Sequence, residues 1–102
     1  MAKVSLFAKF TAKEGKADEL VAAFDDMFAQ VEQEPGTELY VLNRSGSDSN
    51  VFYFYELYTD GDALGAHGSS EAMQKAMATF GELLEDTDMT IGEPLKAKGV
   101  LL

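Results

Sequence analysis

Apolar and polar residues alternate at the beginning of the chain, and this pattern predicts a strand. The apolar positions are Val4, Leu6, Ala8 and Phe10, and the residues between them are polar apart from Phe7. Side chains along a strand point alternately to its two faces, so this segment has one apolar face.

The next segment changes to a spacing of three and four residues, which is typical of an amphipathic helix. Its apolar positions are Ala17, Leu20, Val21, Phe24, Met27, Phe28 and Val31. They predict a single helix of about five turns. The helix is expected to end near Glu34, because Pro35 disfavours helical geometry in the residue before it.

Two segments rich in aromatic and β-branched residues follow, at 38–43 and 51–58. This composition is typical of strands. The polar residues 45–50 between them predict a hairpin loop.

The rest of the chain predicts two helices and a last strand. A short helix is expected from about Asp60 to His67, and a second helix begins after Gly68-Ser69-Ser70, capped by one of the serines. The stretch 89–102 predicts a last strand that is broken near Pro94 and lies at a sheet edge.

The predicted order is strand, helix, strand, strand, helix, strand. This order is the α+β ferredoxin-like plan, with a four-stranded antiparallel sheet and helices on one face. We expect residues 1–102 to form a single domain of this kind.

The predicted sheet has apolar side chains on both faces. On the third strand Tyr53 and Tyr55 point one way, while Phe52 and Phe54 point the other. Two helices cover only one face, so we expect a second copy to cover the other in a face-to-face homodimer. The alternative is a monomer with a partly exposed aromatic face.

The charge of the chain narrows the class of partner. It has 18 Asp and Glu against 8 Lys and Arg, and its formal net charge is −10. Nucleic acids and anionic membranes both require a basic face, so neither is an expected partner. The aromatic third strand carries Glu56 and no basic residue, which also argues against RNA binding.

The cysteine and histidine content excludes several kinds of catalytic and metal site. The chain has no Cys and one His, so disulfides, a thiol nucleophile, a Cys-based zinc site and a multi-histidine metal centre are all excluded within one chain. We expect no metal and no cofactor. No signal peptide or membrane-spanning run is present in the sequence, and we expect a cytoplasmic protein.

Two residues are candidates for proton transfer. His67 is the only side chain with an ordinary pKa near neutrality, and it is either a general base or a structural histidine at a helix end. Glu56 lies among aromatic residues, where burial raises the pKa of a carboxyl. It is either a catalytic group or one partner of a cross-strand ion pair, for instance with Lys9.

Several other side chains are candidates for contacts with a ligand. The tyrosines of the second and third strands are either walls of a pocket for a flat aromatic molecule or part of the core and interface; they are Tyr40, Tyr53, Tyr55 and Tyr58. Asn43 and Arg44 end the second strand, and Arg44 either orients a polar group or is a surface charge.

Three segments carry a resemblance to a known family. They are Glu34-Pro35-Gly36-Thr37-Glu38-Leu39-Tyr40, Phe52-Tyr53-Phe54-Tyr55-Glu56-Leu57-Tyr58 and Asp62-Ala63-Leu64-Gly65-Ala66-His67-Gly68-Ser69-Ser70. Their turn, strand and helix motifs resemble the antibiotic biosynthesis monooxygenase family of dimeric α/β-barrel proteins, over nearly the whole chain.

The resemblance implies a homodimer with a pocket between sheet and helices in each subunit. Several relatives oxidise quinols or aromatic polyketides with dioxygen and without metal or flavin. His67 and Glu56 match the family's histidine and glutamate and are carried over as catalytic residues. Tyr40, Asn43, Phe54 and Tyr58 are the side chains that we expect to bind the substrate in this pocket.

The chain also departs from the family pattern. Many relatives have a second histidine where this chain has Ala72. The chain has no Trp and no Asn in its first strand, which disfavours haem cleavage, and its single arginine disfavours phosphate recognition.

The sequence therefore predicts a cofactor-independent monooxygenase acting on a quinol or hydroxylated aromatic. A non-catalytic dimeric module that binds a small apolar ligand, and an isomerase of a small metabolite, remain as alternatives.

Overall fold

The computed structural model describes residues 2–102 and has four strands and four helices. In chain order they are β1 (Val4–Ala12), α1 (Ala17–Ala23), α2 (Asp25–Val31), β2 (Thr37–Arg44), β3 (Val51–Tyr58), α3 (Gly61–Gly68), α4 (Glu71–Leu83) and β4 (Leu84–Gly92). The strands form one antiparallel sheet in the order β2-β3-β1-β4. The predicted ferredoxin-like α+β fold is confirmed.

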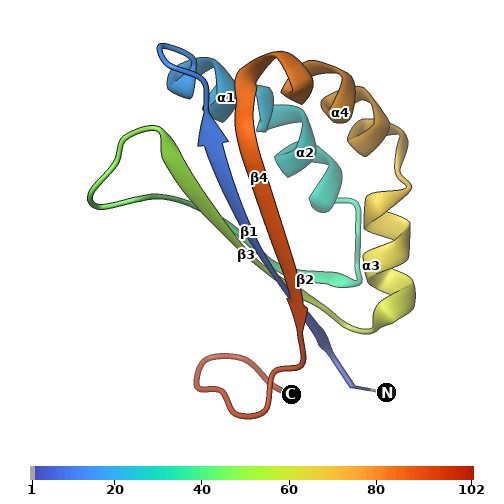
Figure 1. Ribbon diagram of the computed structural model, residues 1–102. Helices are drawn as coiled ribbons and strands as arrows, with labels where there is room; N and C mark the ends of the chain where they lie inside the picture. Colours follow the sequence, from blue (N-terminus) through green and yellow to red (C-terminus); the bar gives the residue numbers. More distant parts are fainter. Residues whose placement is uncertain (1) are drawn as a thin grey trace.

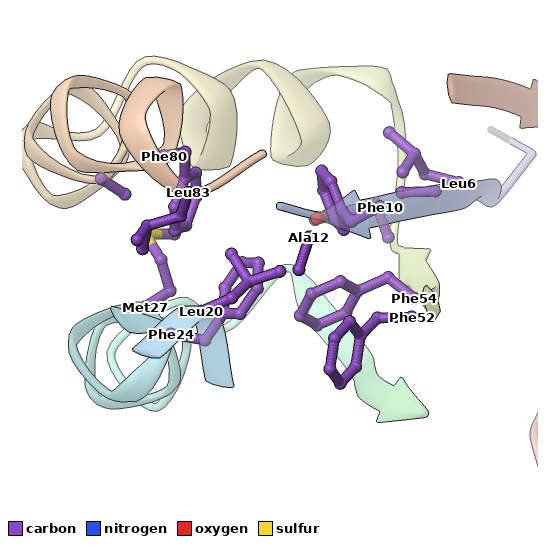
Figure 2. Close-up of a cluster of buried hydrophobic side chains, with 13 residues drawn as sticks. Leu6, Phe10, Ala12, Leu20, Phe24, Met27, Phe52, Phe54, Phe80 and Leu83 are labelled. Carbon is purple, nitrogen blue, oxygen red and sulfur yellow. The ribbon is translucent and has the colours of Figure 1, made fainter. Parts of the chain in front are cut away.

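All four helices lie over one face of the sheet (Figure 1). The core between the two layers is rich in phenylalanine (Figure 2). The ring of Phe24 lies 4.9 Å from that of Phe54 and 4.6 Å from that of Phe80, measured between centroids. Burial of each such side chain stabilises the folded state by about 1.5–3 kcal/mol relative to leaving it exposed. This cluster therefore holds the helices against the sheet.

The prediction of a single long helix before Pro35 is wrong. The structure divides this segment into α1 and α2 at Phe24. The backbone N–H of Phe24 donates to the carbonyl of Val21, three residues earlier, which tightens the chain at this point. The Phe24 side chain remains 2% exposed. The apolar spacing therefore continues through the break and hides it.

The predicted break between α3 and α4 is confirmed, together with its cap. The Ser70 hydroxyl accepts a hydrogen bond from the backbone N–H of Met73 at 3.1 Å. Asp60 caps α3 in the same way, accepting from the N–H of Ala63 at 2.9 Å. Both caps satisfy N–H groups that have no partner within the helix.

The last strand lies earlier in the chain than expected. It begins at Leu84, directly after α4, and pairs with β1 as far as Gly92. Residues 93–102 contain no helix or strand. Strand pairing ends just before Pro94, which has no N–H to donate.

In the described part of the chain, residues 2–102, no helix lies over the second face of the sheet (Figure 1). Leu57 on this face is 0% exposed, whereas Phe7, Val41 and Tyr53 are 49%, 44% and 44% exposed. The second apolar face that the sequence predicts is present, and this chain covers only part of it.

Candidate functional site

A cavity of about 540 Å³ lies between the sheet and helices α3 and α4. Its walls are largely apolar and include Leu6 and Phe10 of β1, Leu64 of α3, and Met73 and Phe80 of α4. Four polar side chains reach the same cavity, those of Tyr40, Glu56, His67 and Thr87. An apolar cavity with a few converging polar groups is the usual form of a small-molecule site.

A larger hollow of about 790 Å³ lies on the helical surface, between α1 and α2 on one side and α4 on the other. Its lining includes Asp25, Asp26, Glu71 and Lys75, all of which are exposed. None of the predicted site residues lines it, so the cavity beside His67 is the candidate site.

His67 is held at the cavity wall near the end of α3, and it is 3% exposed. Its Nδ1 lies 2.8 Å from Oε1 of Glu34. The rings of Tyr40 and Tyr58 pack beside the imidazole, with centroids 5.3 Å and 5.5 Å away. These contacts fix the orientation of the ring.

Glu34 is a site residue that the sequence did not predict. Its carboxylate also accepts hydrogen bonds from Thr37 at 2.7 Å and from Gln30 at 2.9 Å. Burial acts to raise the pKa of Glu34, but the hydrogen bonds from Thr37, Gln30 and His67 outweigh it and hold the pKa below its ordinary value. Glu34 is therefore a carboxylate at neutral pH.

The charge state of Glu34 determines the tautomer of His67. A carboxylate can only accept hydrogen bonds, so Nδ1 of His67 carries the proton of the bond between them. In the neutral ring Nε2 then carries the free lone pair. This arrangement of carboxylate and imidazole is the one that orients a general base.

Glu56 lies on β3 on the helix-facing side of the sheet and is 6% exposed. Burial raises the pKa of its carboxyl above the ordinary value, even though the Tyr58 hydroxyl donates to Oε1 and lowers it. The ion pair with Lys9 is absent, because Lys9 pairs with Tyr53 in the sheet register and so lies on the opposite face. Glu56 can thus keep a proton at a higher pH than an ordinary glutamate.

The two tyrosines next to these groups are held in their neutral form. Burial, followed by the nearby charge of Glu56, raises the pKa of Tyr40. Burial and the hydrogen bond to Glu56 raise the pKa of Tyr58 in the same direction. Both hydroxyls therefore keep their protons at neutral pH, and neither can act as a general base.

The structure brings four of the six predicted site residues to one cavity and separates the other two. Tyr40, Phe54, Glu56 and His67 line the cavity, while Tyr58 lies outside the lining and hydrogen-bonds Glu56. Asn43 pairs with Tyr53 on the opposite face and donates to the Tyr53 carbonyl at 3.1 Å. It is therefore placed away from the cavity.

Arg44 is a surface residue in the structure. Its guanidinium lies 3.6 Å from Asp18 and 5.1 Å from the centre of the Phe52 ring. Both contacts are outside the cavity.

Residues 2–102 contain no group of three or more His, Cys, Asp or Glu side chains placed to hold a metal ion. In the same part of the chain, every helix is too short or too polar to cross a membrane.

Solved structures with this architecture come from several organisms. Protein PA3566 from Pseudomonas aeruginosa is 26% identical, with a TM-score of 0.87, over 94% of this chain and 97% of that one. Rv0793 from Mycobacterium tuberculosis is 27% identical, with a TM-score of 0.87, over 94% and 98%. A Caulobacter crescentus structure named as a candidate antibiotic biosynthesis monooxygenase is 28% identical, with a TM-score of 0.87, over 93% and 92%.

No curated protein sequence matches the chain. The model of the antibiotic biosynthesis monooxygenase family, by contrast, matches residues 4–79, which run from the start of β1 into α4 and include Glu34, Glu56 and His67. The resemblance expected from the three sequence segments is confirmed, and the chain belongs to the antibiotic biosynthesis monooxygenase family.

Proposed function

We propose that the protein is a cofactor-independent monooxygenase that oxidises a quinol or hydroxylated aromatic with dioxygen. The observation that carries this proposal is the pairing of His67 with Glu34 at the wall of an apolar cavity. Membership of the family supports the reaction class. The aromatic walls suit a flat substrate, because rings pack favourably against rings.

The first step is removal of the phenolic proton. Nε2 of His67 takes this proton, and the Glu34 carboxylate stabilises the imidazolium that forms. The products are a phenolate and an imidazolium, which are opposite charges beside each other. The apolar walls exclude water and strengthen this pairing.

The phenolate then reduces dioxygen directly. It passes one electron to O₂, and the resulting aryloxyl radical and superoxide combine to form a carbon–oxygen bond. The peroxide takes the proton from His67. His67 next removes the hydrogen on the same carbon, the O–O bond breaks, and the hydroxide that leaves takes that proton as water. One oxygen atom of O₂ enters the product as a carbonyl and the other becomes water, so the phenol supplies every electron.

Glu56 serves as a second polar group beside the reacting atoms. When it is protonated, its carboxyl can donate a hydrogen bond to a substrate oxygen, and the raised pKa extends to higher pH the range in which it holds that proton. Tyr58 holds this carboxyl in place from behind. Tyr40 and Phe54 pack against the ring of the substrate.

We further propose that the working form is a homodimer in the cytoplasm, in which a second copy covers the sheet face that carries Phe7, Val41 and Tyr53. These three side chains are each more than two-fifths exposed in one chain. Burial of apolar surface of this kind favours association.

Oxygen uptake with 1,4-naphthohydroquinone in metal-free buffer tests the proposed reaction. With ¹⁸O₂, the expected product is a hydroxynaphthoquinone that carries one labelled oxygen atom. His67→Gln should lower the enzymatic rate by 10²-fold or more, on the order of the usual contribution of a general base. Glu32→Gln, an exposed carboxylate on the same side of Pro35, should leave the rate unchanged.

Full activity of a folded His67→Gln variant would show that His67 is not the base. Saturable binding of the aromatic with no oxygen uptake above the buffer background would favour the non-catalytic binding module. The replacement of the second family histidine by Ala72 is the feature that favours this alternative.

A further inference from the structure

The cavity wall has no permanently positive side chain that could pair with an anionic ligand. Among residues 2–102, neither a lysine nor an arginine lines it. Apart from Tyr40, the only ionisable side chains among its lining residues are those of Glu56 and His67. The rest of the wall is apolar or uncharged, with Leu6, Phe10 and Leu64 as examples.

A fixed negative charge lies directly behind the cavity wall. The Glu34 side chain is 12% exposed, and its carboxylate touches His67 on the side away from the free Nε2. Its hydrogen bonds from Thr37 and Gln30 keep it ionised. A second anion in the cavity would face this carboxylate across one imidazole ring.

An anionic substituent would also lose its water without replacement. Burial of an ionised carboxylate in apolar surroundings is costly unless a cation or several hydrogen-bond donors replace the water. The walls supply no lysine or arginine, and their polar side chains are limited to Tyr40, Glu56, His67 and Thr87. Electrostatic repulsion from Glu34 adds to this cost, because the repulsion between two negative charges is only weakly screened away from bulk water.

Proton transfer from an uncharged phenol avoids this problem. When His67 takes the proton, one negative and one positive charge appear together, so the net charge of the site does not change. A substrate that carries an additional carboxylate or phosphate brings a charge that His67 cannot neutralise, because the imidazolium is already paired with the phenolate and Glu34.

We propose that the cavity selects uncharged hydroxyaromatic molecules and rejects carboxylated, sulfonated or phosphorylated ones of the same size. This inference rests on the proposed function, since it names the substrate class of the same site. It assigns the selection to the missing cation in the wall and to Glu34 behind it.

The test uses three matched ligands at pH 7.5 and measures dissociation constants by isothermal titration calorimetry without oxygen. They are 2-naphthol, 6-hydroxy-2-naphthoate and the methyl ester of that acid. The ester is larger than the acid but uncharged, so it separates the effect of size from that of charge. We expect 2-naphthol and the ester to bind, and the carboxylate to bind at least tenfold more weakly than the ester.

A variant that adds a cation tests the cause. Met77 lines the cavity and is 65% exposed, so a lysine at this position can reach both solvent and ligand. Met77→Lys should reduce the preference for the ester over the carboxylate at least fivefold. Ala78→Lys adds the same charge to an exposed position of α4 that does not line the cavity, and should leave the preference unchanged.

The outcomes separate the two proposals. Equal affinity of the wild-type protein for ester and carboxylate would overturn the charge selection and leave the proposed function standing. An unchanged preference in Met77→Lys would likewise overturn the assigned cause. Failure of all three ligands to bind at millimolar concentration would overturn the proposed function and this inference with it.

Discussion

Glu34 is the residue on which the contacts of the candidate site converge. Three side chains, Gln30, Thr37 and His67, are hydrogen-bonded to its carboxylate. They come from the end of α2, the start of β2 and the end of α3. One carboxylate thus ties three elements together at the point where the imidazole must be oriented.

Removal of this carboxylate should destabilise the protein. Glu34→Ala leaves the donors of Gln30, Thr37 and His67 without their acceptor, and we expect a loss of about 1–3 kcal/mol in the free energy of unfolding. Urea denaturation at pH 7 measures it. Glu32→Ala, in the same turn of chain but exposed, should change stability little.

The effect of Glu34 should depend on pH with a defined sign. Because the folded state lowers the pKa of this carboxyl, its contribution is present above the pKa of the unfolded chain, about 4.3, and is lost as the pH falls through the lower folded value. The difference between wild type and Glu34→Ala should therefore shrink below pH 4. A difference that stays constant down to pH 2 would contradict the assignment of an ionised Glu34.

Glu56 should show the opposite dependence. Burial raises the pKa of this acid in the folded state, so the wild-type protein loses stability as the pH rises from the unfolded pKa to the folded one. A tenfold difference in proton affinity between the folded and unfolded states corresponds to about 1.4 kcal/mol. The glutamine of Glu56→Gln cannot ionise, and its amide oxygen can still accept the hydrogen bond from the Tyr58 hydroxyl. The variant should therefore be more stable than wild type at pH 8, and this difference should disappear near pH 4.

A matching control is available on the exposed surface. Glu85→Gln removes a carboxylate from β4 where the side chain is exposed, and its stability should follow that of wild type across the same pH range. A Glu56→Gln variant that gains nothing between pH 4 and pH 8 would show that Glu56 ionises at its ordinary pKa.

At the scale of elements, the turn at Pro35-Gly36 positions the helix that carries His67. A Cβ at Gly36 would lie 2.5 Å from the Cβ of Ala63 in α3, which is closer than two carbon atoms can approach. The Gly36 carbonyl also accepts from the N–H of Thr59 at 2.9 Å, just before α3 begins. Glycine is required here because the Ala63 methyl group lies directly against the turn.

Gly36→Ala should push α3 away from this turn and cost about 1–3 kcal/mol in the free energy of unfolding, as overpacking usually does. Thermal and urea denaturation measure the cost. Gly46→Ala, in the β2–β3 loop where a Cβ would meet nothing within 4 Å, should have little effect. The double variant with Ala63→Gly should recover most of the loss, and a failure to recover would show that contact with Ala63 is not the cause.

Elements with strong local signals could be predicted from the sequence. The strand at 51–58, the 45–50 loop and the Ser70 cap agree with the structure because each depends on residues within a few positions. The break at Phe24 and the direct passage from α4 into β4 were not predictable. In both places the apolar spacing continues across the boundary, with Phe24 in one case and Leu83-Leu84 in the other.

The members of the candidate site that lie on strands could be predicted from the sequence, because side chains alternate between the two faces of a strand. Phe54, Glu56 and Tyr58 alternate on one strand and share a face, whereas Tyr40 and Asn43 are three residues apart and must point to opposite faces. Glu34 could not be found in this way. Its partner His67 is 33 residues away, and only the fold brings the two side chains together.

At the scale of the whole molecule, the sheet separates two surfaces with different expected roles. The helix-covered side holds the cavity, and the other side exposes Phe7, Val41 and Tyr53. The two surfaces share β1, β2 and β3, so their apolar residues alternate along the same strands.

A charge on the open face should prevent the proposed dimer without unfolding the chain. Val41 is 44% exposed and points away from the helices, so Val41→Glu should leave a folded monomer. Sedimentation velocity at micromolar concentration measures this, with circular dichroism as the check on folding. Ile91→Glu, at a 64% exposed position of β4 whose register partner Leu6 lines the cavity side, should remain dimeric. A wild-type protein that sediments as a monomer would refute the dimer.

The match to the family model ends at residue 79, but the cavity does not. Phe80, Leu84, Thr87 and Met89 complete its wall from the end of α4 and from β4. Glu34 and His67, the pair proposed for proton transfer, are held elsewhere, by the segment around Pro35 and by α3. Exchanging this carboxy-terminal part of the wall for that of another family member should therefore change which ligands bind. The relative orientation of Glu34 and His67 should stay the same.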